Sequence, residues 1–198
     1  AAHTRFSFCD GHLPDADYAD LLEGAALLVL PYRQEAYFAR ASSVLEEAIH
    51  SEMEANGKRR PLIIAEEGHL SGATAERFFS SFPRRSVAEI FSNVPHQATE
   101  TAARHVAEQY RVGGCDLLIA FGSNRAMDLA KVSRIAIAFD EPIAALSNDE
   151  GGSQRINGQL PDLYSVPGIL GFASAISDYT RVKLDAGGQV LLSSRHLI

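Results

Sequence analysis

Apolar stretches of strand length alternate with segments of helical period along the chain from Arg60 onward. The predicted strands are Pro61–Ala65, Ser86–Phe91, Leu117–Phe121, Leu163–Val166 and Tyr179–Leu184. The predicted helices between them are Ser71–Phe82, His96–Tyr110 and Ala126–Ala138. This alternation is typical of consecutive strand–helix–strand units, which place helices against a parallel sheet. We therefore expect an α/β fold.

One helical segment has a clear apolar stripe at four-residue spacing, formed by Ala98, Ala102, Val106 and Tyr110. Residues at this spacing share one face of a helix, so we expect them to pack against the sheet. Glu100, Arg104 and Glu108 fall between them and are expected to face water. Gly113 and Gly114 are expected to end this helix.

The sequence patterns of other segments predict different degrees of burial. Leu117–Phe121 contains no polar residue, which predicts a central strand covered on both faces. Ser147–Asp162 is polar and rich in glycine, which predicts an exposed connection. Before Arg60, weaker patterns indicate a helix at Asp17–Gly24, a strand at Ala25–Leu30 and a helix at Ser43–Asn56.

Composition narrows the class of protein. The chain has 198 residues, 46% of them hydrophobic, which is enough for a sizeable core. A net charge of −7 argues against binding to nucleic acid or to an anionic membrane. No apolar run approaches the length of a membrane helix and no signal-peptide pattern is present, so we expect a cytoplasmic protein. Cys9 and Cys115 are expected to be reduced thiols, with Cys115 in the core.

The strongest candidate for a functional site is the segment Gly122–Asp128. Here a predicted strand runs through a glycine-bearing turn into a predicted helix. Free amides and the helix dipole favour an anion at such a turn. Most turns of this kind bind nothing, however. The seven histidines are scattered without ligand spacing, and Gly171–Ser174 lacks the spacing of a serine nucleophile. The residues alone therefore predict no metal site and no hydrolase.

Three segments together resemble the iron-containing alcohol dehydrogenase family. Cys115–Lys131 matches the family's glycine-loop motif at Asp116, Gly122, Asp128, Ala130 and Lys131. Arg60–Leu70 is similar to the family's first strand and turn, with Glu66 at the position of an aspartate that contacts the adenosine ribose. Pro161–Ser174 is similar to a second loop motif and keeps Pro167, Gly171 and Ser174.

The resemblance implies a Rossmann-like parallel sheet with flanking helices, the nucleotide-binding half of a dehydroquinate synthase-like fold, over residues 57–198. It implies NAD or NADP as cofactor and an alcohol, aldehyde or ketone as small-molecule substrate, and it allows a homodimer. The implied cofactor-binding residues are Glu66, Gly122, Ser123, Asn124, Asp128, Pro167, Gly168 and Gly171. The family's metal ligands belong to a following helical domain, which we expect to be absent, so no metal site and no catalytic residue is expected in this chain.

This sequence also departs from the family's pattern. Ser123, Asn124 and Arg125 stand where the family has two glycines and a serine, and side chains there crowd the approach to a diphosphate. Gly168 and Ile169 replace two threonines, and Gln189 replaces a lysine near the cofactor. Asn124 can still adopt a left-handed conformation and Arg125 can offer charge to a phosphate. These changes predict an incomplete or degenerate cofactor site.

A different resemblance covers Leu30–Ala48, which is similar to a sugar-nucleotide-binding segment of retaining glycosyltransferases, with Glu47 at the position that contacts the ribose. Residues 1–56 are therefore either an extension of separate origin or the first strand–helix unit of the same domain. Three hypotheses stay open from the sequence: a dehydrogenase nucleotide-binding portion, a non-catalytic α/β module, and a sugar-nucleotide-binding fragment. The substrate and the choice between NAD and NADP do not follow from the sequence.

Overall fold

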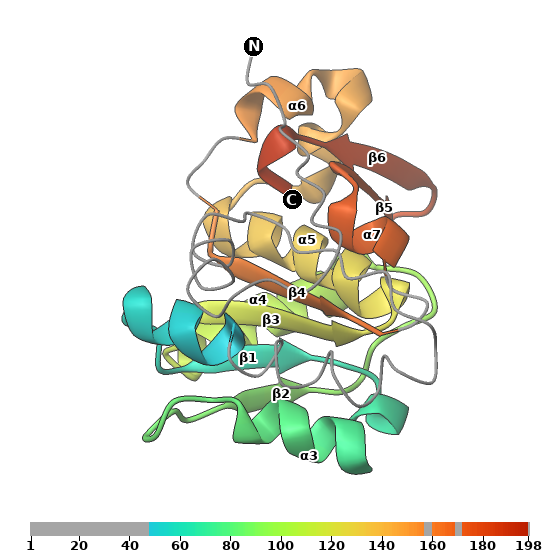
Figure 1. Ribbon diagram of the computed structural model, residues 1–198. Coiled ribbons are helices and arrows are strands. Elements are labelled where there is room, and N and C mark those ends of the chain that lie inside the picture. The colour runs from blue at the N-terminus through green and yellow to red at the C-terminus, as the bar shows by residue number, and fades with distance from the viewer. Residues whose placement is uncertain (1–47, 157–159, 169–171, 198) are drawn as a thin grey trace, which may run out of the picture.

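The structure is a computed structural model that describes residues 48–156, 160–168 and 172–197 (Figure 1). After a helix that covers residues 48–55, the elements are β1 (Pro61–Ile64), η1 (Glu67–His69), α3 (Ala73–Ser80), β2 (Glu89–Phe91), α4 (Glu100–Val112), β3 (Leu117–Gly122), α5 (Asn124–Ala138), η2 (Ile143–Leu146), η3 (Asn148–Glu150), α6 (Gly152–Arg155), β4 (Leu163–Pro167), α7 (Phe172–Ile176), β5 (Tyr179–Lys183), β6 (Gln189–Ser193) and η4 (Arg195–Leu197). The predicted helix at Ser43–Asn56 is confirmed over its described part, whereas the elements predicted at Asp17–Gly24 and Ala25–Leu30 lie outside the described residues.

The central sheet has the strand order β2–β1–β3–β4, and all of its strand pairs are parallel. This confirms the predicted α/β fold with a parallel sheet and flanking helices. In register, Ile63 lies between Ile90 of β2 and Ile119 of β3. Because the strands are parallel, their carboxyl ends meet at one edge of the sheet, where Gly122 pairs with Pro167. This edge is where ligands bind in open α/β sheets.

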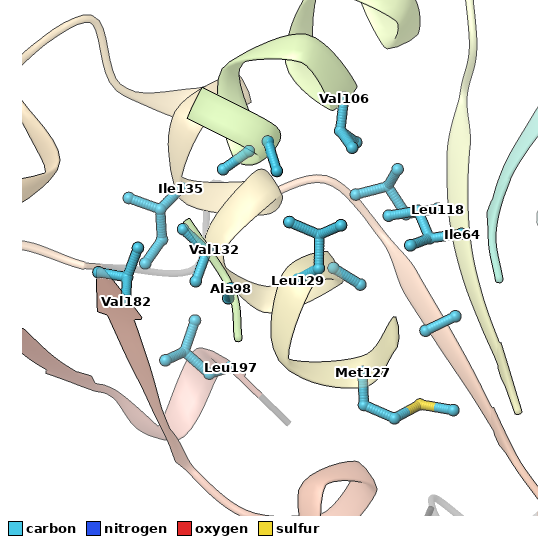
Figure 2. Packing of buried hydrophobic residues seen from close by; sticks show 14 of the residues in the cluster. Ile64, Ala98, Val106, Leu118, Met127, Leu129, Val132, Ile135, Val182 and Leu197 are labelled. Carbon is cyan, nitrogen blue, oxygen red and sulfur yellow. The ribbon is translucent and has the colours of Figure 1, made fainter. Parts of the chain in front are cut away.

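Alternate residues of the strands enter two separate apolar clusters, one on each face of the sheet. Leu62, Ile64 and Leu118 belong to the cluster that α4 and α5 cover. Figure 2 shows Ile64 and Leu118 on one side of α5, and Val182 and Leu197 on its other side. The opposite face of the sheet packs on two helices. The helix covering 48–55 contributes Ile49 and Met53, and α3 contributes Phe78. Every residue of β3 is buried, so the predicted central strand is confirmed.

The aromatic pair Phe78 and Phe121 joins α3 to the end of β3. The two rings are stacked, with centroids 4.2 Å apart and planes 2° from parallel. Stacked aromatic pairs contribute roughly 0.5–1.5 kcal/mol beyond the burial of their surface. The pair therefore holds α3 against β3, the strand that leads into the Gly122 turn.

The prediction that Glu100 faces water is wrong, because its residue is only 7% exposed. Helix α4 begins at Glu100, and Thr99 caps it by accepting a hydrogen bond from the Ala102 amide at 3.1 Å. The Glu100 carboxylate accepts from Arg104 and from the Asp185 amide, the latter at 3.2 Å. The turn between β5 and β6 therefore covers a position that helical periodicity assigns to solvent.

The prediction of an exposed connection at Ser147–Asp162 is also wrong in part. This segment forms η3 and α6, and Gly152, Ile156 and Leu160 are buried. The Asn148 side chain accepts hydrogen bonds from the amide and the hydroxyl of Ser193, at 3.1 and 3.0 Å. The segment is therefore held against β6, although its composition resembles that of a solvated loop.

The antiparallel strands β5 and β6 form a separate ribbon that extends the core. Val182 and Leu192 from this ribbon are fully buried in the cluster around α5. Cys115 is buried as a free thiol, as predicted, whereas Cys9 lies outside the described residues. Across the described ranges, none of the helices combines the length and the apolar character that crossing a membrane requires.

Candidate functional site

The candidate site lies at the carboxyl edge of the sheet, where β3 turns into α5 through Gly122 and Ser123. Gly122 has a φ of 103°, a conformation that side chains other than hydrogen rarely tolerate. Ser123 is the N-cap of α5, and its Oγ accepts hydrogen bonds from the amides of Arg125 at 3.1 Å and Ala126 at 3.4 Å. Two amides that an anion would use at this helix end are thus bound by the chain's own side chain.

Glu66 lies beside this turn because β1 and β3 are neighbours in the sheet. The hydroxyl of Ser123 donates a hydrogen bond to Oε1 of Glu66 across 57 positions of sequence. The other carboxylate oxygen, Oε2, is buried and has no hydrogen-bond partner in the part of the chain that the structure describes. A buried carboxylate oxygen without a partner is energetically costly, so this atom is ready to accept from a hydroxyl group.

The ring of His69 lies directly on the backbone of Gly122. A Cβ atom placed on Gly122 would be 2.7 Å from both Cγ and Cδ2 of His69 and 3.1 Å from its Nε2. The same ring meets the edge of Phe121, with centroids 6.4 Å apart. Gly122 is therefore a glycine for two reasons that need no ligand, its positive φ and the neighbouring imidazole.

A second close approach joins the ends of β3 and β4. The Gly168 amide donates to the Gly122 carbonyl at 2.6 Å, and a Cβ atom on Gly168 would lie 3.1 Å from that oxygen. A side chain at Gly168 would require the Gly122 turn to move by a few tenths of an ångström. Pro167 and Gly168 thus stand next to the turn that Gly122 and Ser123 form.

The polar face of α5 is directed at α7 and the residues after it. Asn124 accepts a hydrogen bond from the Ser174 amide at 3.3 Å through Oδ1. One and two turns further along the helix, Asp128 and Lys131 face the same segment. The ammonium group of Lys131 donates to the carbonyls of Ser174 and Ser177, and to the Ser177 hydroxyl at 2.8 Å. Asn124, Asp128 and Lys131 therefore hold α7 and the residues that follow it against α5.

Burial shifts the proton affinities of the two charged residues in this network in opposite directions. Burial lowers the pKa of Lys131 to about 8, although the nearby carboxylates of Asp128 and Asp178 favour its charged form. Burial raises the pKa of Asp128, while hydrogen bonding to Ser174 and the charge of Lys131 act against the rise. The charge of each residue therefore favours the charged form of the other.

The structure brings some of the predicted cofactor residues together and directs others elsewhere. Glu66, Gly122 and Ser123 form one contact group, with Pro167 and Gly168 adjoining it. Asn124 and Asp128 bond to the α7 segment instead, and Gly171 lies outside the described residues. The structure shows these positions only, and binding of a cofactor by them stays a prediction.

Sequence reasoning missed His69 as a residue of this site. Nothing in the local sequence marks it, because its contact with Gly122 depends on the pairing of β1 with β3. Lys131 was recognised as part of a motif, and its total burial is a finding of the tertiary structure. Arg125, which was expected to offer charge, is exposed at the start of α5. Gln189, at the position of a family lysine, is exposed and donates to Gln97 at 3.2 Å.

Within the described ranges, no three His, Cys, Asp or Glu side chains gather closely enough to hold a metal ion. Among the buried side-chain oxygens and nitrogens of the described residues, Glu66 Oε2 and the Ser86 hydroxyl are the ones without a hydrogen-bond partner. The sheet edge around Glu66 is thus the described region where an unsatisfied buried carboxylate meets a strand-to-helix turn.

Comparison with known proteins gives a consistent result. The family described as iron-containing alcohol dehydrogenase matches residues 41–198. A 4-hydroxybutyrate dehydrogenase of Cupriavidus necator is 33% identical over 150 residues, which are 76% of this chain and 39% of that protein. The family match begins at residue 41, inside the segment that resembles glycosyltransferases, and most of that segment lies outside the described residues.

Solved structures with the same fold include a 1,3-propanediol oxidoreductase, with a TM-score of 0.69 and 15% identity over 77% of this chain and 40% of that one. A sulfoacetaldehyde reductase of Bifidobacterium kashiwanohense, solved in complex with NAD+, has a TM-score of 0.66 and 19% identity over 77% of this chain and 40% of that one. These similarities show a shared fold. The chain spans about two fifths of the length of the proteins it matches.

Proposed function

This chain belongs to the iron-containing alcohol dehydrogenase family, and from that premise we propose that its described domain is the NAD-binding part of an alcohol dehydrogenase-like oxidoreductase. The observation that carries the proposal is the buried, unpartnered Oε2 of Glu66, which lies beside the strand-to-helix turn at Ser123. In dinucleotide-binding α/β folds, a carboxylate in this relation to the turn accepts hydrogen bonds from the adenosine ribose.

The described residues fit a dinucleotide at the ribose end and require one adjustment at the diphosphate end. Glu66 Oε2 offers an acceptor that ribose hydroxyls complete. At the turn, the amides of Arg125 and Ala126 are bound by Ser123, and His69 covers Gly122. A diphosphate therefore displaces weak internal contacts rather than entering an open cradle.

Most of the predicted cofactor residues have a role under this proposal. Glu66 binds the ribose, the turn formed by Gly122, Ser123 and Asn124 faces the diphosphate, and the exposed Arg125 supplies positive charge. Gly168 lies beside the adenine or the nicotinamide, and Asp128 shapes the turn from within α5. When bound, the nicotinamide supplies hydride transfer, while the protein orients it.

Glu66 also favours NAD over NADP. Its carboxylate stands where the ribose 2′ position would lie, and a phosphate at that position would meet a like charge beside a buried oxygen. We therefore propose NAD as the cofactor. The substrate is an alcohol, aldehyde or ketone, and the name of the C. necator relative makes 4-hydroxybutyrate the first compound to test.

A non-catalytic α/β module is the second candidate function, favoured by the internal capping of α5 by Ser123 and by the His69 ring on Gly122. Calorimetric titration of the chain with NADH, NADPH and a UDP-sugar separates the candidates. Micromolar binding of NADH that exceeds NADPH supports the proposal. If none of the three ligands binds, the result supports the non-catalytic module. If the UDP-sugar alone binds, it supports the sugar-nucleotide fragment.

Composition supports the remaining elements of the proposal. The net charge of −7 favours a small-molecule ligand over nucleic acid or an anionic membrane surface. The buried free thiol of Cys115 is compatible with a reducing, cytoplasmic location. A homodimer is compatible with these features, and its test is the sedimentation behaviour of the purified protein.

A further inference from the structure

The imidazole of His69 covers the face of Gly122 on which a side chain would stand. We propose that His69 closes the diphosphate position of the unliganded chain, and that dinucleotide binding turns the ring outward. The inference rests on the proposed cofactor site and concerns its regulation by this chain's own side chain. It follows from the distance of 2.7 Å between the ring carbons and a Cβ placed on Gly122.

The local backbone explains why the ring lies there. Directly after β1 the chain forms the short turn η1, in which the His69 amide donates to the Glu66 carbonyl at 2.8 Å. Because β1 pairs with β3, this turn carries the His69 side chain over the end of β3. The ring rests against the edge of Phe121 and against the hydrogen-only face of Gly122.

The contact excludes a phosphate for a steric reason. Phosphate oxygens bind backbone amides at roughly 2.7–3.2 Å, which requires open space in front of the glycine. The ring carbons lie 2.7 Å from the position of a Cβ on Gly122, so the imidazole fills that side of the glycine. Cofactor and ring therefore compete for one position.

The same contact is weak enough to be displaced. His69 is exposed, and none of the side-chain hydrogen bonds described for these parts of the chain involves its ring. Turning the ring outward gives up its contacts with Phe121 and Gly122 and leaves the strand pairing untouched. The apparent affinity for a ligand falls by the fraction of molecules in the open conformation. Removing the ring should raise that affinity.

Titration of the wild-type chain, H69A and the control variant H96A with NADH and with inorganic pyrophosphate tests the inference. His96 is an exposed histidine outside the site, so H96A controls for the loss of an imidazole. We expect H69A to bind both ligands about 5- to 10-fold more tightly than wild type and H96A to match wild type. Weaker or equal binding by H69A overturns the inference, since the ring would then assist the diphosphate or ignore it.

A spectroscopic measurement reports the ring position directly. In the unliganded wild type, a nuclear Overhauser effect should connect the His69 ring proton on Cδ2 with the Gly122 α-protons, and saturating NADH should abolish it. Its absence without ligand, or its persistence in the saturated complex, overturns the inference while leaving the proposed function standing. If neither wild type nor H69A binds NADH, the proposed function fails, and the inference fails with it.

Discussion

Lys131 and Ser177 are joined twice, because the Lys131 ammonium group donates to both the carbonyl and the hydroxyl of Ser177, the latter at 2.8 Å. The two residues are 46 positions apart, and Lys131 is completely buried. Buried ammonium groups need such acceptors because desolvation disfavours the charge. The lysine that closes the family's first motif thus holds the segment that follows its second motif.

This contact predicts a pH-dependent stability. Burial lowers the pKa of Lys131 to about 8 in the folded chain, below its value of about 10.4 in the unfolded chain. Between these values the unfolded chain binds more protons, so folding stability should rise with pH over that window. Below about pH 8 the full cost of burying the charge is present.

In urea titrations, the free energy of unfolding of wild type minus that of K131M should increase by roughly 2–3 kcal/mol from about pH 7.5 to about pH 10.5. Lys183 is an exposed lysine, and K183M serves as the matched control for the loss of a surface lysine. A wild-type to K131M difference that stays flat across this pH range would refute the role of the buried amine.

Restoring a glycine at Ser123 should open the end of α5. In S123G, the amides of Arg125 and Ala126 lose their internal acceptor, and the N-cap changes to a residue that costs only a few tenths of a kcal/mol. We expect tighter NADH binding by about 3- to 10-fold, within the range that two freed amide donors can supply. Stability should fall by about 1–3 kcal/mol, because Glu66 Oε1 also loses its donor. S123A should cost about 1 kcal/mol more than S123G through loss of the cap, which thermal unfolding measures.

Substitution of Glu66 should change the discrimination between NAD and NADP. E66A removes the ribose acceptor and the like charge together, so NADH binding should weaken by about 10-fold while NADPH binding stays equal or improves. The ratio of the two dissociation constants, measured by titration, is the decisive quantity. E67A changes the next carboxylate, which is exposed, and should leave that ratio as it is in wild type.

A methyl group on Gly122 should be tolerated better when His69 is absent. G122A places Cβ in a left-handed backbone, which costs roughly 1–2 kcal/mol, and within 2.7 Å of the His69 ring. In the H69A background the steric part should vanish, so a double-mutant cycle of unfolding free energies should give a coupling of at least about 0.5 kcal/mol. Additive effects of the two substitutions would show that the ring does not press on the glycine.

The stacked pair of Phe78 and Phe121 predicts a large effect of substitution on stability. F78A removes a ring that is 3% exposed and stacked at 4.2 Å, and it should destabilise the chain by about 3–5 kcal/mol. V112A, at an apolar residue that is 83% exposed, should change stability by less than about 0.5 kcal/mol. Equal midpoints of chemical denaturation for the two variants would contradict this packing.

Periodicity predicted the elements from Arg60 onward because it reports local geometry. The all-apolar segment at Leu117–Phe121 became the fully buried β3, and the four-residue spacing around Val106 became the buried face of α4. Strand Ser86–Phe91 was predicted too long, since only Glu89–Phe91 pairs with β1 at the edge of the sheet. Glu100 and the segment at Ile156 were misjudged because their burial is supplied by β5, β6 and the turn between them.

The sequence by itself determined the α/β class, the parallel sheet, the family motifs and the place of the strand-to-helix turn at Gly122, because alternation, strand length and motif spacing are properties of the local chain. Only the tertiary structure decided that Ser123 bonds to Glu66, that Lys131 holds Ser177, and that His69 lies on Gly122. The physical reason is that each of these contacts joins residues from different elements, so its distance depends on which strands are neighbours and not on how far apart the residues stand along the chain.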